Sequence, residues 1–507
     1  MRFRLARSWL AKASKARKSH ASSSNLLQNP CRTNDLPRRL MAINVRLREF
    51  IAAWHKHCAT PATGHQRQPN FQPDREVSMP SHPETTPLAP EDASWVGKLG
   101  PGLITGAADD DPSGIATYSQ AGAQFGYSML WTVIFTYPLM VAIQIISARI
   151  GRVSGHGLAT NIYRHYPGWL LYWIVGLLLI ANTVNIAADV AAMGNALKLL
   201  IGGPAQIYAL GFGIVSLGLQ LYIPYRHYVR VLKWLTLALF AYVGIVFTVQ
   251  IPWGVVLEKT VFPSLSLHAD YVTTVVAVFG TTISPYLFFW QASQEVEEQR
   301  GDAAARPIRY APKQAATNFR RIKIDTAIGM AFSNVVAFFI ILATAVTLNL
   351  HGVTDIQTTE QAASALRPIA GEFAFWLFSA GIIGTGFLAV PVLAGSAAYA
   401  MAGAFRWKNS LALKPALAKR FYGIIAIATL IGVALCFTSL DPIKGLYWSA
   451  VINGVISVPI MAVMMLMASR TDVMGRFIIG RRLRQAGWAA TVCMAIAVMA
   501  MLGAMVA

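Results

Sequence analysis

Long apolar stretches recur along the sequence from residue 97 onward, and they constrain the fold more than any other feature. A helix needs about 20 apolar residues to cross the roughly 30 Å hydrocarbon core of a bilayer. Windows of that length predict eleven spans, at 97–122, 127–148, 168–198, 206–223, 232–252, 270–295, 324–349, 373–403, 421–438, 446–468 and 486–506. Because backbone groups cannot stay unpaired in lipid, we predict an all-α integral membrane protein.

The composition agrees with this class and argues against a soluble enzyme. Only 13% of the 507 residues are charged, about half of the roughly 25% that is usual in soluble domains. The four cysteines have no CxxC spacing, so they indicate neither a disulfide framework nor a zinc site. The sequence has no nucleophile–base set, phosphate-binding loop or HExxH motif, and we expect neither enzymatic activity nor a resident cofactor.

The N-terminal part of the chain is strongly basic. Residues 1–78 hold fifteen Lys or Arg against four Asp or Glu, and they supply eleven of the net charge of +20. We predict a disordered cytoplasmic tail over 1–95 and a transmembrane domain over 96–507, with Met79 as an alternative start of the chain. The expected partners of the protein include membrane lipid but no nucleic acid.

Basic residues are confined to alternate loops. The loops after spans two, four, six, eight and ten carry Arg and Lys, whereas the others hold mostly acidic or neutral residues, such as Glu258 and Asp355. The positive-inside rule places the basic loops and the N-terminus in the cytoplasm. Eleven spans then leave the C-terminus outside, in an inner or plasma membrane.

The first span contains three adjacent acids and a proline. Asp109, Asp110 and Asp111 precede Pro112, and Gly114 follows two residues later. Proline lacks an N–H and its ring clashes with the preceding turn, so we expect the helix to break here. A cation would satisfy the freed carbonyls and the carboxylates together. The alternative is a helix that begins at Pro112, with the aspartates in water as partners of its dipole.

The sixth span shows the same pattern. Gly280, Thr281, Ser284 and Pro285 interrupt it, and polar Gln291 lies in its second half. Spans one and six are the first members of two successive groups of five. Interrupted helices at matching places in two halves are typical of inverted-repeat transporters, with the site at the breaks. A purely structural kink at Pro285 is the alternative.

Four stretches of the sequence carry a family resemblance: the opening GPG, DPSGIAT on span one, GTTISPYL on span six and LYWSAVINGVISVP on span ten. Through them, residues 96–507 resemble the NRAMP family of divalent metal transporters. The resemblance implies a LeuT-like fold of two inverted five-helix repeats with broken helices one and six. Asp111 matches the family's principal metal ligand, and Gly114 replaces its asparagine. Ser284 stands at the family's methionine and Tyr286 at its histidine, and the ligating backbone carbonyl falls on Thr281.

These departures point to the NRAMP-related magnesium transporter branch. A thioether is a soft ligand, whereas the Ser284 hydroxyl makes the expected site all-oxygen, as Mg²⁺ prefers and Mn²⁺ accepts. We expect Gly114 and Tyr286 to leave room for water on the ion. Asp109 and Asp110 are expected to form an acidic vestibule that concentrates cations.

Proton coupling is expected to be weak or absent. Gln291 occupies a position where the family has a histidine, and glutamine does not titrate. Asp189 lies beside the family's acidic position on span three, but a structural hydrogen bond is an equal alternative. Asn453 on span ten either faces the site or bonds a neighbouring helix.

Divalent cation transport by alternating access, of Mg²⁺ and/or Mn²⁺, is therefore the predicted function. One alternative is a proton-coupled Mn²⁺/Fe²⁺ carrier of the same family. Another is a sodium-coupled small-solute symporter of LeuT-like fold, although three local aspartates would repel the carboxylate of an amino-acid substrate.

Overall fold

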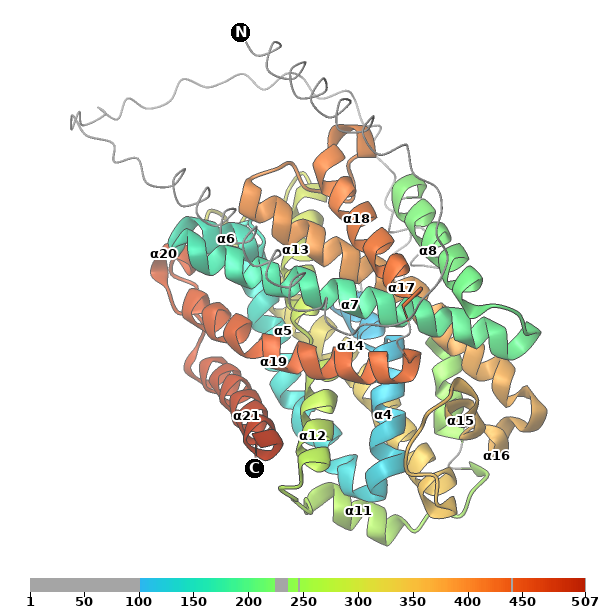
Figure 1. The fold of residues 1–507 in the computed structure, drawn as a ribbon. Helices are drawn as coiled ribbons and strands as arrows, with labels where there is room; N and C mark the ends of the chain where they lie inside the picture. The colour runs from blue at the N-terminus through green and yellow to red at the C-terminus, as the bar shows by residue number, and fades with distance from the viewer. Residues whose placement is uncertain (1–100, 224–235, 245–246, 439–440, 507) are drawn as a thin grey trace, which may run out of the picture. The chain divides into compact units, whose positions relative to one another are not determined.

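The computed structural model describes residues 101–223, 236–244, 247–438 and 441–506, and the regular structure in these ranges is helical (Figure 1). The helices up to residue 261 are α3 Pro101–Asp109, α4 Pro112–Phe125, η2 Gly126–Met129, α5 Leu130–Ser154, α6 Leu158–His165, α7 Gly168–Ile201, α8 Ala205–Tyr222, η3 Thr236–Phe240, α10 Ala241–Gly244 and α11 Trp253–Val261. Those that follow are α12 Ala269–Thr282, α13 Pro285–Gly301, η5 Pro312–Gln314, α14 Ala315–Thr347, η6 Asn349–His351, α15 Thr359–Ser364, α16 Arg367–Ala370, η7 Gly371–Phe373, α17 Ala374–Phe405, η8 Pro415–Leu417, α18 Lys419–Leu435, α19 Pro442–Ala468, α20 Thr471–Met474 and α21 Arg481–Val506.

Most of the predicted spans correspond to single helices. Within the described ranges, eight helical segments are long and apolar enough to cross a membrane. The ninth predicted span coincides with α18, which has 17 residues. The fifth, at 232–252, lies partly outside the described residues, so the total of eleven stays a prediction. The predicted boundary between tail and membrane domain at residue 95 also lies outside them.

Both predicted helix breaks are confirmed. The first span consists of α3 and α4, separated by two residues, and the sixth consists of α12 and α13, separated in the same way. Pro112 and Pro285 each begin the second half of their span. Proline cannot continue the preceding helix, but it fits the first turn of a new one, where its missing N–H is not needed.

The two halves of the protein pack in the same way, because the second span of each half packs against the broken span of the other half. α14 packs against α3 and α4, and α5 packs against α12 and α13. Glycine permits both contacts: a Cβ on Gly106 would lie 2.2 Å from the Gly329 carbonyl oxygen, and one on Gly151 would lie 2.3 Å from the Ala292 oxygen. Small residues let membrane helices approach in this way. The exchange is the one expected of the inverted repeats of a LeuT-like fold.

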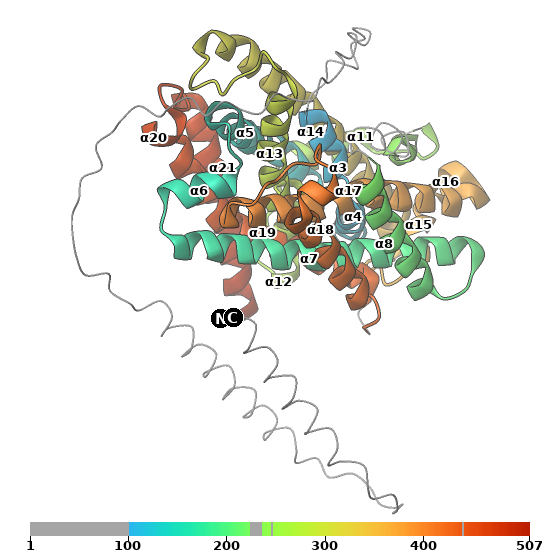
Figure 2. The ribbon, with the colours of Figure 1, turned by 90° about the horizontal axis from the view of Figure 1, so that it is seen from above.

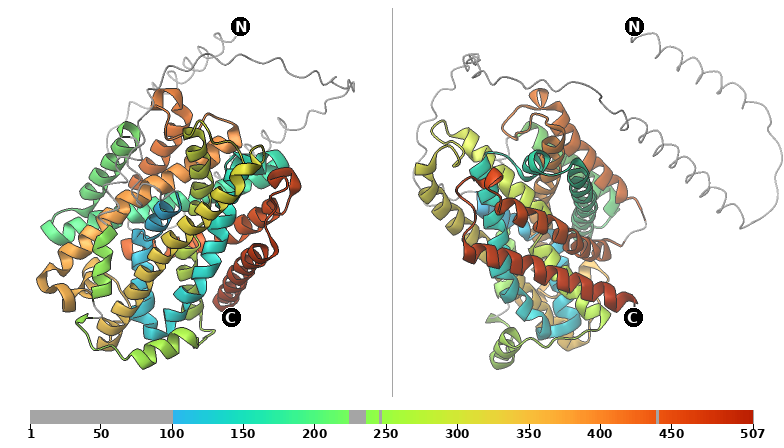
Figure 3. Two further views of the ribbon diagram at one scale, coloured as in Figure 1. Left: turned by 180° about the vertical axis from the view of Figure 1, so that it is seen from behind. Right: turned by 90° about the vertical axis from the view of Figure 1, so that its left-hand side faces the viewer.

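Long helices enclose the two breaks. α7 and α19 cross in front of α4 and α12 (Figure 1), and the view from above places α4 between α7 and α14 (Figure 2). α17 packs along α7, and α21 lies on the outside against α5, α12 and α19 (Figure 3). The polar residues of the breaks are therefore held in the interior of the helical bundle.

Candidate functional site at the two helix breaks

Asp111 occupies the break of the first span and caps the helix that follows. Its backbone is extended (φ −70°, ψ 169°), and its side chain closes the first turn of α4. Oδ1 accepts hydrogen bonds from the Gly114 amide at 2.7 Å and from the Ser113 hydroxyl at 2.6 Å. Asp is among the best N-cap residues because its oxygen satisfies amides that have no partner in the helix. The local sequence therefore fixes one oxygen of Asp111.

The second oxygen of Asp111 joins the break to two distant helices. Oδ2 accepts from the Asn185 amide of α7 at 2.9 Å and from the Tyr286 hydroxyl of α13 at 3.3 Å. The single hydrogen of this hydroxyl is shared with the Ala108 carbonyl, whose oxygen lies 3.1 Å away. A carboxylate offers about four lone-pair directions, so all of its acceptor capacity is used. Asp111 is 1% exposed, so these donors, rather than solvent, surround its carboxyl group.

The break of the sixth span lies against the first. A Cβ on Gly114 would be 3.2 Å from the Thr281 hydroxyl oxygen, so α4 and α12 approach closely at this glycine. Ser284 is the N-cap position of α13, but its hydroxyl donates back to the Gly280 and Thr281 carbonyls, at 2.8 and 2.7 Å. The structure thus brings Gly114 and Thr281 together, and it directs the Ser284 hydroxyl back to carbonyls at the end of α12.

Asp109 and Asp110 face a different neighbour from Asp111. The Ser333 hydroxyl of α14 lies 2.6 Å from Asp109 Oδ2 and 3.0 Å from Asp110 Oδ1. The exposures of the two aspartates are 0% and 1%, so neither carboxylate faces solvent in this conformation, and their role as an acidic vestibule stays a prediction. Among the described residues, no three His, Cys, Asp or Glu side chains converge on one metal position. The acidic triplet is therefore split between two environments.

The remaining predicted residues, Asp189, Gln291 and Asn453, are all buried. Asp189 lies one turn after Asn185 and near the Ser113 amide, but neither of its oxygens has a partner at hydrogen-bond geometry. The Gln291 side-chain oxygen accepts from the Thr105 hydroxyl, which links α13 to α3. Asn453 is buried on α19, and no hydrogen bond joins it to Asp111 within the part of the chain that the structure describes.

The sequence did not indicate the contacts of two residues at the site. Asn185 was visible as a polar residue inside an apolar span, but nothing local indicated that its amide reaches Asp111. Tyr286, which was expected to leave room for water on the ion, places its hydroxyl 3.3 Å from the Asp111 carboxylate. Tyr286 is 1% exposed, and its ring is packed in the core.

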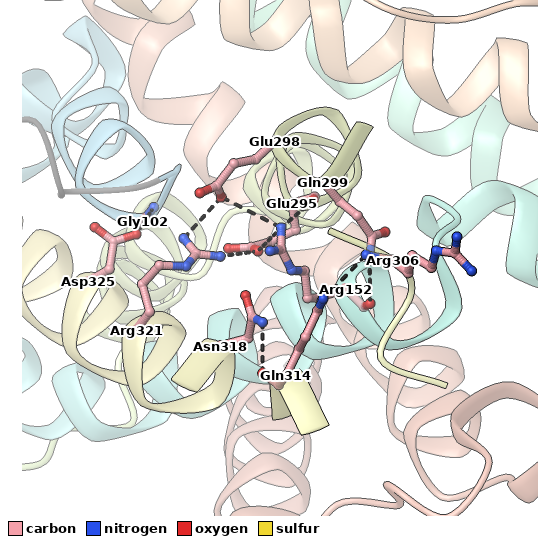
Figure 4. A network of polar contacts seen from close by, with 10 residues as sticks. All are labelled: Gly102, Arg152, Glu295, Glu298, Gln299, Arg306, Gln314, Asn318, Arg321 and Asp325. Carbon is pink, nitrogen blue, oxygen red and sulfur yellow. Dashed lines mark hydrogen bonds and ion pairs between the residues drawn. The ribbon is translucent and has the colours of Figure 1, made fainter. Parts of the chain in front are cut away.

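The break is closed on both sides. On the side predicted to be extracellular, a cavity of about 10 Å³ lies between α4, α7, α15, α17 and α19, which is room for one water molecule at most. On the opposite side, ion pairs hold α13 to α5 and α14 (Figure 4). Buried Glu295 lies 2.5 Å from Arg321 and 4.0 Å from Arg152, and half-exposed Glu298 lies 3.0 Å from Arg321. The site is therefore occluded.

The first half of the broken span is also fixed on the predicted cytoplasmic side. The Gly102 amide of α3 donates to the Asp325 carboxylate of α14 at 2.7 Å (Figure 4). The close approach of Gly106 to Gly329 lies one turn further along α3. These contacts, together with the packing of α3 along α14, hold this side of the first span in place.

Comparison with known proteins agrees with this architecture. The chain is 24% identical over 373 residues to the divalent metal cation transporter MntH of Caldanaerobacter subterraneus subsp. tengcongensis, covering 70% of this chain and 80% of that protein. It is 25% identical over 405 residues to the protein of that name from Klebsiella pneumoniae subsp. pneumoniae, covering 77% and 90%. Both relatives are named as transporters rather than enzymes.

Structural comparison gives the same fold at lower identity. The manganese transporter of Eremococcus coleocola, crystallised with an aromatic bis-isothiourea substituted compound, superposes with a TM-score of 0.61 at 18% identity. The match covers 82% of this chain and 88% of that one. The family described as Natural resistance-associated macrophage protein-like matches residues 102–504. The expected resemblance is thereby confirmed, and the chain belongs to the Nramp family.

Proposed function

We propose that this protein carries a divalent metal cation across the membrane by alternating access, with Asp111 as its principal ligand. The observation that carries the proposal is the position of Asp111, a fully buried carboxylate at the point where the two helix breaks meet. The relatives described above are named divalent metal cation and manganese transporters. A buried carboxylate at a helix break within a membrane domain is the feature that such a cargo requires.

The donors around Asp111 suggest how a cation would enter. Ser113 can rotate its hydroxyl, and Asn185 can turn its amide so that Oδ1, which has no partner in this structure, faces the ion. The Tyr286 hydroxyl can release Asp111 and keep its bond to the Ala108 carbonyl. Only the Gly114 amide is fixed as a donor. Cation binding then exchanges hydrogen bonds for metal–oxygen contacts at a site that already exists.

The oxygens available favour a hard cation. The groups that could bind the metal all do so through oxygen: the Asp111 carboxylate, the Thr281 carbonyl and the Ser113 hydroxyl. The Ser284 hydroxyl could join them if it releases the carbonyls to which it now donates. Such a set suits Mg²⁺ and Mn²⁺, which bind carboxylate, carbonyl and water. We therefore propose Mg²⁺ and/or Mn²⁺ as cargo.

We further propose weak or absent proton coupling. Gln291 carries no titratable proton, and its oxygen is held by Thr105. Asp189 is the nearest further carboxylate on α7, and its unpartnered oxygens make it the residue to test if protons do move. The basic loops are proposed to face the cytoplasm, with the C-terminus outside.

Uptake into proteoliposomes tests the proposal. We expect Mg²⁺ entry without acidification of an internal pH dye, and loss of entry in Asp111→Ala. Ser284→Met supplies a thioether at the break and is expected to shift preference from Mg²⁺ toward Mn²⁺. Mn²⁺ entry with acidification and no Mg²⁺ entry would instead identify a proton-coupled manganese carrier; the Eremococcus relative is itself named a manganese transporter. Transport of neither ion would refute the proposal.

A further inference from the structure

A polar cavity lies away from the helix breaks, on the side where the loops are basic. It has a volume of about 330 Å³ and opens between α6, α13 and α17, which contact one another. Its polar lining includes Thr160 and Ser293 beside the charged side chains Arg164, Arg300 and Arg406. None of these residues takes part in the site around Asp111.

The cavity carries excess positive charge. Three guanidinium groups face one carboxylate, Glu297, and both oxygens of Glu297 have other partners. Oε1 accepts from the Tyr399 hydroxyl at 3.1 Å, and Oε2 accepts from the Ser410 hydroxyl at 2.7 Å. Arg164, Arg300 and Arg406 form no ion pair with any residue that the structure describes. The cavity therefore has room and charge for an anion.

Two of the arginines are held in place by uncharged partners, so no carboxylate neutralises them. Arg300 donates from one nitrogen to Asn409, at 3.3 Å to the carbonyl and 3.5 Å to the side-chain oxygen, which leaves its other N–H groups available. The Arg406 guanidinium lies 5.7 Å from the centre of the Tyr163 ring. Both contacts hold the guanidinium groups beside the cavity.

The backbone of Arg406 is in an unusual conformation. Its φ of 57° and ψ of 38° lie in the left-handed region, and it is the one such non-glycine residue in the described ranges. This conformation is unfavourable for a residue with a side chain. Glycine is the ordinary residue at this helix end, whereas the residue here carries a guanidinium group that lines the cavity.

His156, in the loop before α6, lines the same cavity. Its pKa is lowered by burial and by the charges of Arg164, Arg300 and His165. The first turn of α6 also lines the cavity, and its N-cap, Gly157, has no side chain to satisfy the free amides. Free amides at a helix start add to the attraction for an anion.

We propose that this cavity binds a phosphate group, held by Arg164, Arg300 and Arg406. Arginine matches phosphate because its planar group donates two parallel hydrogen bonds. The phosphate would belong either to a lipid headgroup or to a free phosphate. Its binding would connect the cytoplasmic end of α13 to α6 and α17, and it does not depend on the cargo of the transporter.

Thermal unfolding of the full-length protein in neutral detergent tests this site. Inorganic phosphate is titrated at constant ionic strength, and in a second arm phosphatidic acid is compared with phosphatidylcholine. We expect saturable stabilisation by phosphate, phosphatidic acid or both, and none by phosphatidylcholine. Stabilisation by the lipid alone identifies a headgroup site, and stabilisation by inorganic phosphate identifies a site for the free anion.

Three variants separate specific binding from general charge. Arg300→Gln and Arg406→Gly remove cavity charges and should weaken binding about tenfold or more, the loss expected for a charge-assisted hydrogen bond. Arg406→Gly also suits the left-handed backbone, so it should fold well. Arg476→Gln is the control, because Arg476 is exposed and packs on the Phe477 ring outside the cavity. Equal binding by all three variants, or no stabilisation of the wild type, would overturn the proposal.

Discussion

Asp111→Asn separates two roles that Asp111 has in the structure, helix cap and negative charge. Asparagine caps a helix about as well as aspartate. Its oxygen can accept from Ser113 and Gly114, and its amide can face Asn185, whose Oδ1 has no other partner. We therefore expect the free energy of unfolding without metal to change by about 1 kcal/mol or less.

Metal binding should respond very differently to the same substitution. The change removes the negative partner of a buried cation, and removal of one partner of a buried ion pair costs about 3–5 kcal/mol. That corresponds to a loss of roughly 10²- to 10⁴-fold in affinity. A variant with a normal fold and almost no affinity for metal is the expected result.

Two measurements on one preparation test both expectations, the unchanged free energy of unfolding and the lost affinity for metal. Thermal unfolding in detergent, without and with Mg²⁺ or Mn²⁺, reports stability and binding, and uptake into proteoliposomes reports transport. Asp109→Asn is the matched control, because Asp109 accepts from Ser333 and not from the groups around Asp111; it should weaken transport only mildly. Equal and mild effects of the two variants, or an Asp111→Asn protein that is unstable but still stabilised by metal, would show that Asp111 is a cap and not a ligand.

Three further substitutions test other parts of the structure. Tyr286→Phe removes a donor that competes with the cation, so the apparent affinity measured by uptake should rise roughly three- to tenfold; a fall would make the hydroxyl a ligand. Gly106→Ala places a Cβ against the Gly329 carbonyl, and should lower stability by about 1–3 kcal/mol in thermal unfolding. Glu295→Gln should destabilise by about 3 kcal/mol or more, whereas the half-exposed Glu298→Gln should change stability by about 1 kcal/mol or less.

The helix breaks were predictable because their causes are local. Pro112 and Pro285 exclude a continuous helix through the ring and the missing N–H, whatever surrounds them. The N-cap bonds of Asp111 are equally local, since they reach only two and three residues along the chain. The resemblance then named the fold, and the family match over residues 102–504 agrees with it.

The same local view could not say what surrounds a side chain when its neighbours come from another helix. Asp109 and Asp110 were expected to form an acidic vestibule, and their neighbour in the structure is Ser333 of α14, more than 220 residues away in sequence. Tyr286 was expected to leave space, because a sequence shows which side chain is lost from a motif and not where its replacement points. Its hydroxyl reaches Asp111 across 175 residues.

By itself, the sequence determined that this chain is a helical membrane protein with two broken spans and an acid at the first break. Apolar length and proline geometry decide those features within a few turns of helix. Only the tertiary structure decided which donors surround Asp111, that the site is closed on both sides, and that three arginines share a cavity on α6, α13 and α17. These depend on how helices cross in three dimensions, and the crossing is set by side-chain packing between residues far apart in the chain.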